Sequence, residues 1–220
     1  MSHATGSLRS VWLGSHLLNE PTGAAAHAAA QALGPGVHAR LLEAGDRLAA
    51  TSAVLAQRYY RRAAAMWSAF GAEGFARWLA LGESLAAGDP ACRDGAGAFF
   101  TLTPAGFGRG GLDAATGWCS LGRELAATSP KLAALFFRGT AALLRKPGAL
   151  DRLRPWVDVG RGLYGQHGWQ GEFLAQAYFA AAPHALLVLH PGAYQLSAGF
   201  DSEQRQLAAT FELQSSTLPP

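Results

Sequence analysis

The chain has 220 residues, a net charge of +3 and a pI near 9.1, and half of its residues are hydrophobic whereas only 15% are charged. This composition supplies ample apolar surface for a folded core. Alanine and leucine dominate, β-branched residues are few and no alternating strand pattern persists, which together exclude a β-rich fold and indicate an all-α fold.

The composition also excludes a membrane span and a disulfide framework. The longest apolar run, residues 175–189, is interrupted by polar residues and a proline, and it is shorter than the ~20 residues that a membrane span requires. The two cysteines, Cys92 and Cys119, have no metal-site spacing and no framework role. Because the start of the chain lacks a convincing signal peptide, we expect a cytoplasmic protein.

In chain order, the first expected element is a degenerate N-terminal helical cap over residues 1–39, with helices at about 10–18 and 24–33. Helical-repeat units are then expected at about 40–74, 75–111, 112–149 and 150–193, with a closing half-unit at 194–213. The helix of the half-unit is marked by Phe200, Gln204 and Leu207. Residues 214–220 are expected to be a disordered tail.

The units are defined by a glycine that is followed three residues later by a leucine. The glycines are Gly45, Gly82, Gly122 and Gly160, which are 37, 40 and 38 residues apart. Four residues before them lie Leu41, Trp78, Trp118 and Trp156. Apolar residues at positions i, i+4 and i+7 share one face of a helix, so the first helix of each unit presents one apolar stripe.

Each unit continues with a helix N-cap and then an aromatic pair. Ser52, Asp89 and Ser129 are good N-cap residues. The aromatic pairs are Tyr59-Tyr60, Phe99-Phe100, Phe136-Phe137 and Tyr178-Phe179. We expect Phe136 to share the core side of its helix and Phe137 to face the adjacent unit. In units two to four a third short helix is expected after the pair, held to the core by Phe107, Leu144 and Leu186.

The predicted fold is therefore an α-helical repeat solenoid, HEAT- or armadillo-like, with αα or ααα units of about 37–40 residues. The predicted repeat core consists of Trp78, Gly82, Phe99, Phe100, Trp118, Gly122, Phe136, Phe137, Trp156, Gly160, Tyr178 and Phe179. The glycines lie inside helices, where glycine costs roughly 1 kcal/mol relative to alanine, and close helix packing is the explanation that fits them best.

The sequence contains no recognisable catalytic, phosphate-binding or metal-binding motif. The nearest pair of histidines, His184 and His190, is six residues apart, which places them on different faces of a helix. The acidic residues are scattered along the chain. The sequence accordingly assigns no catalytic, cofactor-binding or metal-ligating residues, and it predicts no cofactor and no enzymatic activity.

The positive charge is carried by 16 arginines and two lysines. Eight of these could form a basic ridge if the units stack in register: Arg58, Arg61, Arg62, Arg138, Arg145, Lys146, Arg152 and Arg154. An ordinary solvated face is one interpretation of this pattern. A contact with an acidic protein partner and a contact with a nucleic-acid backbone are the other two.

The recurring W-x-x-x-G-x-x-L-A…S-P…A-x-x-F-F unit resembles the helical repeats that precede the von Willebrand factor A domain in a bacterial family. That family comprises nitric oxide reductase activation proteins and Rubisco activase adaptor subunits, whose partners are MoxR-type AAA+ ATPases. The resemblance covers most of residues 40–210. The metal-binding D-x-S-x-S motif of the A domain is absent, because Asp201-Ser202 is followed by Glu203-Gln204.

The resemblance implies a non-catalytic protein–protein interaction module that acts as the adaptor or substrate-docking arm of a chaperone-like AAA+ system. Its partner would be the ATPase itself or a metalloenzyme or Rubisco-like target. The chain would then be a repeat-only relative or the N-terminal piece of a longer protein. The alternatives are a HEAT-like nucleic-acid-binding protein or base-excision glycosylase, and a carrier of a hydrophobic ligand.

Overall fold

In the computed structural model of the protein, the described residues are Leu13 and the ranges 17–166, 169–181, 197–201 and 206–210. Over residues 17–181 the described chain is helical, which confirms the all-α prediction. The helices are α2 (Pro21–Ala32), α3 (Pro35–Thr51), α4 (Ala53–Ala86), α5 (Pro90–Phe99), α6 (Gly111–Thr128), α7 (Pro130–Thr140), α8 (Ala149–Gln166) and α9 (Trp169–Ala181). Two short 3₁₀ helices, η1 (Pro104–Phe107) and η2 (Ala141–Arg145), follow α5 and α7.

The long helix α4 is interrupted at Gly71, whose φ of 67° and ψ of −174° lie outside the helical region. Glycine reaches this backbone conformation without the steric cost that a Cβ atom imposes. The interruption divides α4 into two helical arms, residues 53–70 and 72–86. The first arm pairs with α3 and the second begins the next helical pair.

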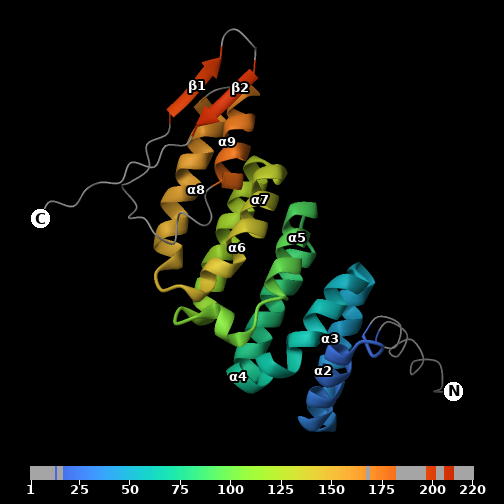
Figure 1. Cartoon of the computed structure of the whole chain (residues 1–220). Coiled ribbons are helices and arrows are strands. Elements are labelled where there is room, and N and C mark those ends of the chain that lie inside the picture. The colour runs from blue at the N-terminus through green and yellow to red at the C-terminus, as the bar shows by residue number, and fades with distance from the viewer. Residues whose placement is uncertain (1–12, 14–16, 167–168, 182–196, 202–205, 211–220) are drawn as a thin grey trace, which may run out of the picture.

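The helices form two layers that run along the length of the molecule (Figure 1). In one layer α4 contacts α6, and α6 contacts α8. In the other layer α4 contacts α5, α5 contacts α7, and α7 contacts α9. Each helical pair therefore packs on the pair before it.

The N-terminal boundaries differ from the prediction. The helix α2 begins at Pro21, and α3 begins at Pro35, five residues before the expected start of the first unit. Proline is favoured at the first turn of a helix because its missing N–H would have no partner there, so Pro35 starts a helix where we expected it to end one. Except for Leu13 and residues 17–18, the helix expected at 10–18 lies outside the described residues.

The expected N-caps hold at two of the three positions. The Ser52 hydroxyl accepts a hydrogen bond from the Leu55 amide at 3.4 Å, and the Asp89 carboxylate accepts one from the Cys92 amide at 2.9 Å. Ser129 occupies the N-cap position of α7, but its side chain makes no capping hydrogen bond. There, Pro130 at the first turn leaves fewer amide groups to be satisfied.

The short third helix is confirmed in units two and three, where it is η1 and η2. Phe107 in η1 and Leu144 in η2 are both buried, as expected. The third helix expected in unit four would lie at residues 182–196, which are outside the described residues.

The predicted core residues are buried in three successive units, and their rings repeat one arrangement. The tryptophan of each unit meets the second aromatic residue of the same unit edge to face. The centroid distances are 5.2 Å for Trp78 and Phe100, 4.9 Å for Trp118 and Phe137, and 4.7 Å for Trp156 and Phe179. Edge-to-face pairs of this kind contribute about 0.5–1.5 kcal/mol beyond their buried area.

The motif glycines provide the space for these rings. A Cβ atom added to Gly82, Gly122 or Gly160 would collide with the ring of Phe100, Phe137 or Phe179, respectively. Glycine is therefore required at the three positions by close approach of an aromatic ring, and the loss of helix propensity is the cost of that packing.

The first aromatic residue of each pair connects neighbouring units. Tyr59 lies 5.5 Å from Trp78, Phe99 lies 6.4 Å from Trp118, and Phe136 lies 6.4 Å from Trp156. Phe136 lies on the core side of its helix, as predicted. Phe136 is the residue that contacts the following unit, because its ring lies between the two tryptophans.

Phe137 packs on Gly122 of its own unit and on Gly95 of the preceding one, so it faces an adjacent unit, as predicted. Both phenylalanines are fully buried. A helix presents positions 136 and 137 about 100° apart, and in this two-layer packing both directions are covered, so both rings contact a neighbouring unit.

The half-unit expected at 194–213 is corrected as well. Residues Ser197–Asp201 (β1) and Gln206–Thr210 (β2) form an antiparallel pair of strands, in which Phe200 is opposite Leu207. The spacing of these two residues, i and i+7, predicts neighbours on one helical face. A short apolar pattern does not separate a helix from paired strands, which explains the error.

Candidate functional site

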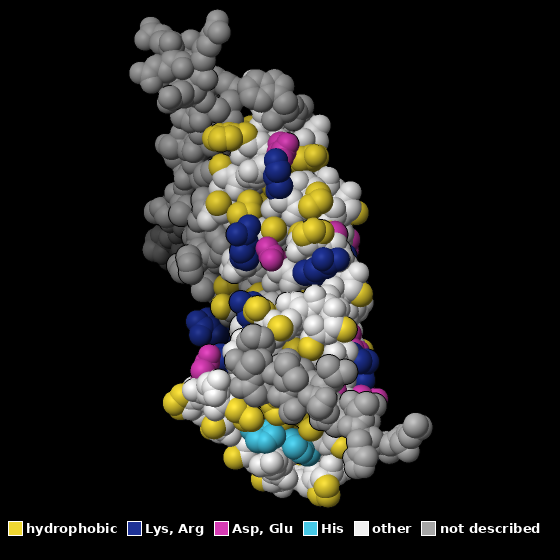
Figure 2. All heavy atoms as spheres, turned by 90° about the vertical axis from the view of Figure 1, so that its right-hand side faces the viewer, with side chains coloured by type: hydrophobic (Ala, Val, Ile, Leu, Met, Phe, Trp, Pro, Cys, Tyr) yellow, Lys and Arg dark blue, Asp and Glu magenta, His cyan; other side chains and the backbone are white. Residues whose placement is uncertain are grey.

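The structure does not bring the eight residues of the predicted basic ridge together. Arg61 pairs with the carboxylate of Glu20, and Arg62 donates from Nε to the Thr101 carbonyl oxygen at 3.1 Å. Figure 2 shows basic side chains interspersed with acidic ones on the face that it displays. Part of the predicted ridge is therefore used in contacts between the units.

The C-terminal half of the ridge is spread along η2 and α8. Arg145 and Lys146 are exposed where η2 ends. Arg154 lies 3.8 Å from the Glu124 carboxylate, which Arg161 also approaches at 3.8 Å. Arg152 is exposed on α8.

Ion pairs connect equivalent faces of consecutive units. Their partners are 36 to 41 residues apart, which is the length of one unit. They are Arg47 with Glu83 at 2.9 Å, Arg77 with Asp113 at 2.7 Å, and Lys131 with Glu172 at 2.8 Å. Exposed pairs of this kind stabilise by only about 0–1 kcal/mol each, so they help to set the register of the units more than they stabilise the fold.

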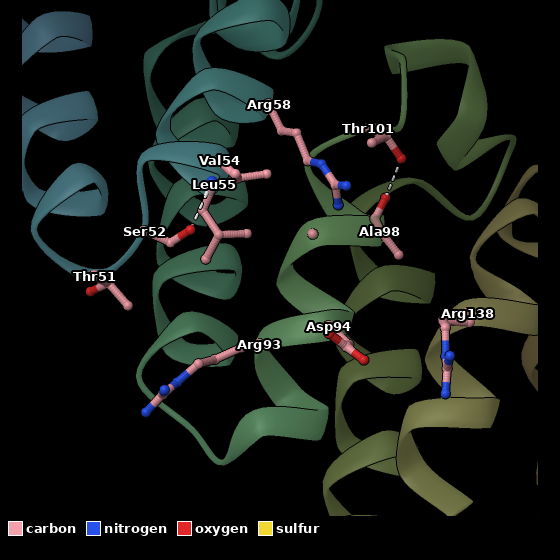
Figure 3. A pocket seen from close by; sticks show the side chains of 11 residues that line it. Thr51, Ser52, Val54, Leu55, Arg58, Arg93, Asp94, Ala98, Thr101 and Arg138 are labelled. Atoms are coloured by element: carbon pink, nitrogen blue, oxygen red, sulfur yellow. Dashed lines mark hydrogen bonds between the residues drawn. The ribbon is translucent and has the colours of Figure 1, made fainter. Parts of the chain in front are cut away.

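Two residues of the predicted ridge, Arg58 and Arg138, do come together, in a groove of about 740 Å³ (Figure 3). Its walls come from the junction of α3 and α4, from α5, and from α7. The lining residues are Thr51, Ser52, Val54, Leu55, Arg58, Arg93, Asp94, Gly97, Ala98, Thr101 and Arg138. The groove thus takes residues from three successive units.

Arg58 extends from α4 across the surface of α5. A Cβ atom on Gly97 would collide with Nη1 of Arg58, so the guanidinium lies directly on this glycine. Gly97 is buried although it faces the groove. Of the ion pairs and hydrogen bonds among the described residues, none involves the Arg58 side chain, so its donors are available to a ligand.

The other charged residues surround this position. Arg138 stands on α7 on the far side of α5, with its Nε donating to the Ala134 carbonyl oxygen at 3.1 Å. Arg93 donates from Nε to the Gly88 carbonyl oxygen at 3.2 Å, and Asp94 lies on α5 between Arg93 and Arg138 in Figure 3. The lining therefore holds three positive charges and one negative charge.

The groove also has apolar and hydroxyl groups. Val54 is 54% exposed, although large apolar side chains in this structure are mostly buried. The hydroxyl groups of Ser52 and Thr101 are engaged inside the fold, since Ser52 caps α4 and Thr101 donates to the Ala98 carbonyl oxygen at 2.6 Å. The ligand-facing chemistry is thus arginine donors, one carboxylate, the Thr51 hydroxyl and an aliphatic surface.

A second polar cluster lies at the N-terminal end, where histidine side chains reach the surface (Figure 2). Nδ1 of His27 and Nε2 of His38 lie 3.1 and 3.0 Å from the hydroxyl oxygen of Tyr60. Burial, and then the neighbouring His27, lowers the pKa of His38. Sequence reasoning singled out only His184 and His190 and missed this cluster.

The buried thiols are kept in their protonated form. Burial raises the pKa of Cys119 to about 12, and burial and the neighbouring Asp89 raise that of Cys92. A thiol reacts and binds metals as the thiolate, so these two cysteines act as small apolar core residues. No group of three or more His, Cys, Asp or Glu side chains in the described part of the chain is placed to hold a metal ion.

Comparisons of the chain with protein-family models, with curated proteins and with solved structures find no match. No helix among the described residues has the length and apolar character that crossing a membrane requires.

Sequence reasoning identified Arg58 and Arg138 but missed Arg93, Asp94 and Gly97. A signal for Gly97 was present, because it follows Arg58 by 39 residues, the spacing of one unit. The Nε–carbonyl contact of Arg62 with Thr101 has the same spacing. Adding the length of one unit to the number of an exposed residue predicts its neighbour in the next unit, and this rule places Arg58 beside Gly97.

Proposed function

We propose that the chain is a helical-repeat solenoid that binds other proteins. The observation that carries this proposal is the groove, which takes residues from three successive units and becomes continuous only when the units stack in register. A solenoid offers binding surfaces of this kind because neighbouring repeats jointly form them. The ring contacts and ion pairs between units hold the lining residues in place.

The chemistry of the groove suits binding more than catalysis. Arginine stays protonated at every physiological pH, so Arg58, Arg93 and Arg138 donate hydrogen bonds without exchanging protons. Asp94 is exposed on α5 and adds a carboxylate to the lining. A groove with these groups can bind and orient an anionic partner.

The resemblance of the repeat motif to the region ahead of the von Willebrand factor A domain suggests the class of partner. On that basis we propose a role as an adaptor or docking arm for a MoxR-type AAA+ ATPase, or for the target that this ATPase remodels. The MoxR-type systems of this family imply a cytoplasmic setting.

The test is binding of the purified chain to the MoxR-type ATPase encoded nearest to its gene, measured by calorimetry with and without ATP. A saturable complex that alters the ATPase rate is the expected result. If the chain instead binds single- or double-stranded DNA at 0.1 M salt with a steep salt dependence and binds no ATPase, the nucleic-acid alternative replaces this proposal.

A further inference from the structure

We propose that the groove between α4, α5 and α7 binds an extended, acidic segment of a partner protein through Arg58 and Arg138. This inference rests on the proposed role as a protein-binding solenoid and adds the location and the ligand chemistry. Its starting point is that the two arginines lie on opposite sides of α5 and both project into one open groove (Figure 3).

The position of Arg58 is set by the shape of α5. Because Gly97 has no side chain, the guanidinium can lie against the backbone of α5, where any larger residue would displace it. The Arg58 side chain also makes no ion pair or hydrogen bond with another described residue. The side chain is thus positioned by packing on Gly97. The N–H groups of its guanidinium, whose geometry matches a carboxylate, remain available to a ligand.

Asp94 favours a protein segment over a nucleic acid or free phosphate. It places a negative charge on α5 near the arginines, and that charge repels a dianionic free phosphate more than it repels a single carboxylate. An extended peptide also offers backbone N–H groups from which the Asp94 carboxylate can accept hydrogen bonds, whereas the sugar-phosphate backbone of DNA offers no donor. The groove therefore complements a chain that carries carboxylates and amide donors together.

The uncharged part of the lining points to the same class of ligand. The exposed Val54 and the half-buried Ala98 give the lining an aliphatic surface beside the arginines, whereas Leu55 is buried. Proteins that bind single-stranded nucleic acids provide aromatic side chains for base stacking, and none of the residues lining this groove is aromatic. An aliphatic side chain next to an acidic residue fits this combination.

The probe for the test is a fluorescein-labelled octapeptide of alternating glutamate and leucine, titrated with the full chain at 50 mM salt and followed by fluorescence anisotropy. The control peptide carries glutamine in place of every glutamate. We expect saturable binding of the acidic peptide, at least tenfold weaker binding of the control, and weakening of the acidic complex at 500 mM salt.

Four substitutions locate the site. Arg58→Ala and Arg138→Ala should each weaken the acidic peptide about fivefold, as expected for one partly exposed charged contact. Gly97→Ala should weaken it as well, because the new methyl group displaces the Arg58 guanidinium while the fold is kept. The matched control, Arg145→Ala, removes an exposed arginine outside the groove and should leave the affinity unchanged.

Asp94→Asn tests the choice of ligand. It should raise the affinity for inorganic phosphate and for an oligothymidylate more than the affinity for the acidic peptide. The inference is overturned if the wild-type chain prefers phosphate or the oligonucleotide, if no peptide binding is detectable at 1 mM, or if Arg58→Ala, Arg138→Ala and Arg145→Ala behave alike.

The calorimetric experiment with the AAA+ ATPase separates this inference from the proposed function. ATPase binding that is insensitive to Arg58→Ala and Arg138→Ala would retain the adaptor role and remove the groove from it. Peptide binding at the groove without any ATPase binding would retain the site and remove the proposed partner.

Discussion

Replacing Gly122 by alanine is the sharpest test of how the units pack. Gly122 lies inside α6, and a Cβ atom there would overlap the Cζ end of the Phe137 ring. The ring has no room to retreat, because its opposite end lies over Gly95 of α5, where an added Cβ would come within 2.7 Å of Cγ. Trp118 also covers it, at 4.9 Å between ring centroids.

Two opposing effects determine the magnitude. Glycine to alanine inside a helix gains roughly 1 kcal/mol of helix propensity. Forcing an extra methyl group into a closed core costs about 1–3 kcal/mol, and the upper end applies here because the overlap is with a fully buried ring. The expected net result is a loss of about 2 kcal/mol in unfolding free energy, or about 4–8 °C in Tm for a chain of this size.

The assay is chemical and thermal unfolding followed by circular dichroism, with Gly162→Ala as the matched control. Gly162 lies in α8 and has nothing within 4 Å of an added Cβ, so this variant should gain about 0.5–1 kcal/mol. Adding Phe137→Leu to Gly122→Ala should recover part of the loss, because the smaller side chain vacates the contested space. A Gly122→Ala chain at least as stable as the wild type would refute the packing argument.

Three further outcomes are expected. Phe136→Ala should cost about 3–5 kcal/mol of unfolding free energy, since it empties a fully buried position between two tryptophans. Thr140→Val should cost about 1–3 kcal/mol, because it leaves the buried indole N–H of Trp118, now 2.8 Å from the Thr140 hydroxyl, without an acceptor. Burial and His27 lower the pKa of His38 in the fold, so the unfolded chain binds the proton more tightly and the unfolding free energy should fall as the pH drops from 7.5 to 5. His38→Gln should reduce this dependence of the unfolding free energy on pH. An unchanged dependence in the variant would count against this account of the cluster.

The sequence was sufficient to predict the helical pairs, because their signals are local or strictly periodic. The tryptophan, the glycine and the aromatic pair recur at nearly constant spacing, and a recurring apolar face must be covered in every unit. The caps Ser52 and Asp89 likewise act on amide groups within three residues of themselves. The interruption of α4 at Gly71 lies close to residue 74, where the sequence predicted the end of the first unit.

Features that depend on how one unit faces the next were harder to predict. Phe136 and Phe137 are adjacent and both apolar, so only the positions of α5 and α8 decide which ring meets which neighbour. The hairpin of β1 and β2 was not predicted, because the spacing of Phe200 and Leu207 is compatible both with a helix and with a cross-strand pair.

The candidate groove could be predicted only in part. The clustering of arginines near the aromatic pairs indicated Arg58 and Arg138, but equally indicated Arg61 and Arg62, whose charges are used within the fold. What separates these two pairs of arginines is the group that each side chain meets in the fold. Arg58 meets Gly97, which leaves its donors open, whereas Arg62 meets a carbonyl oxygen that occupies one of them.

The helix glycines of this chain thus fall into distinct kinds that alanine substitution can separate. At Gly122 the space is filled by a core ring, so alanine should lower stability. At Gly97 it is filled by the movable end of Arg58, so alanine should preserve or raise stability while weakening the acidic peptide. At Gly162 the space is open, and alanine should raise stability and leave binding alone. If Gly97→Ala lowers both the unfolding free energy and the affinity for the acidic peptide, Arg58 supports the core. Arg58 would then no longer count as a donor that the groove holds ready for a ligand.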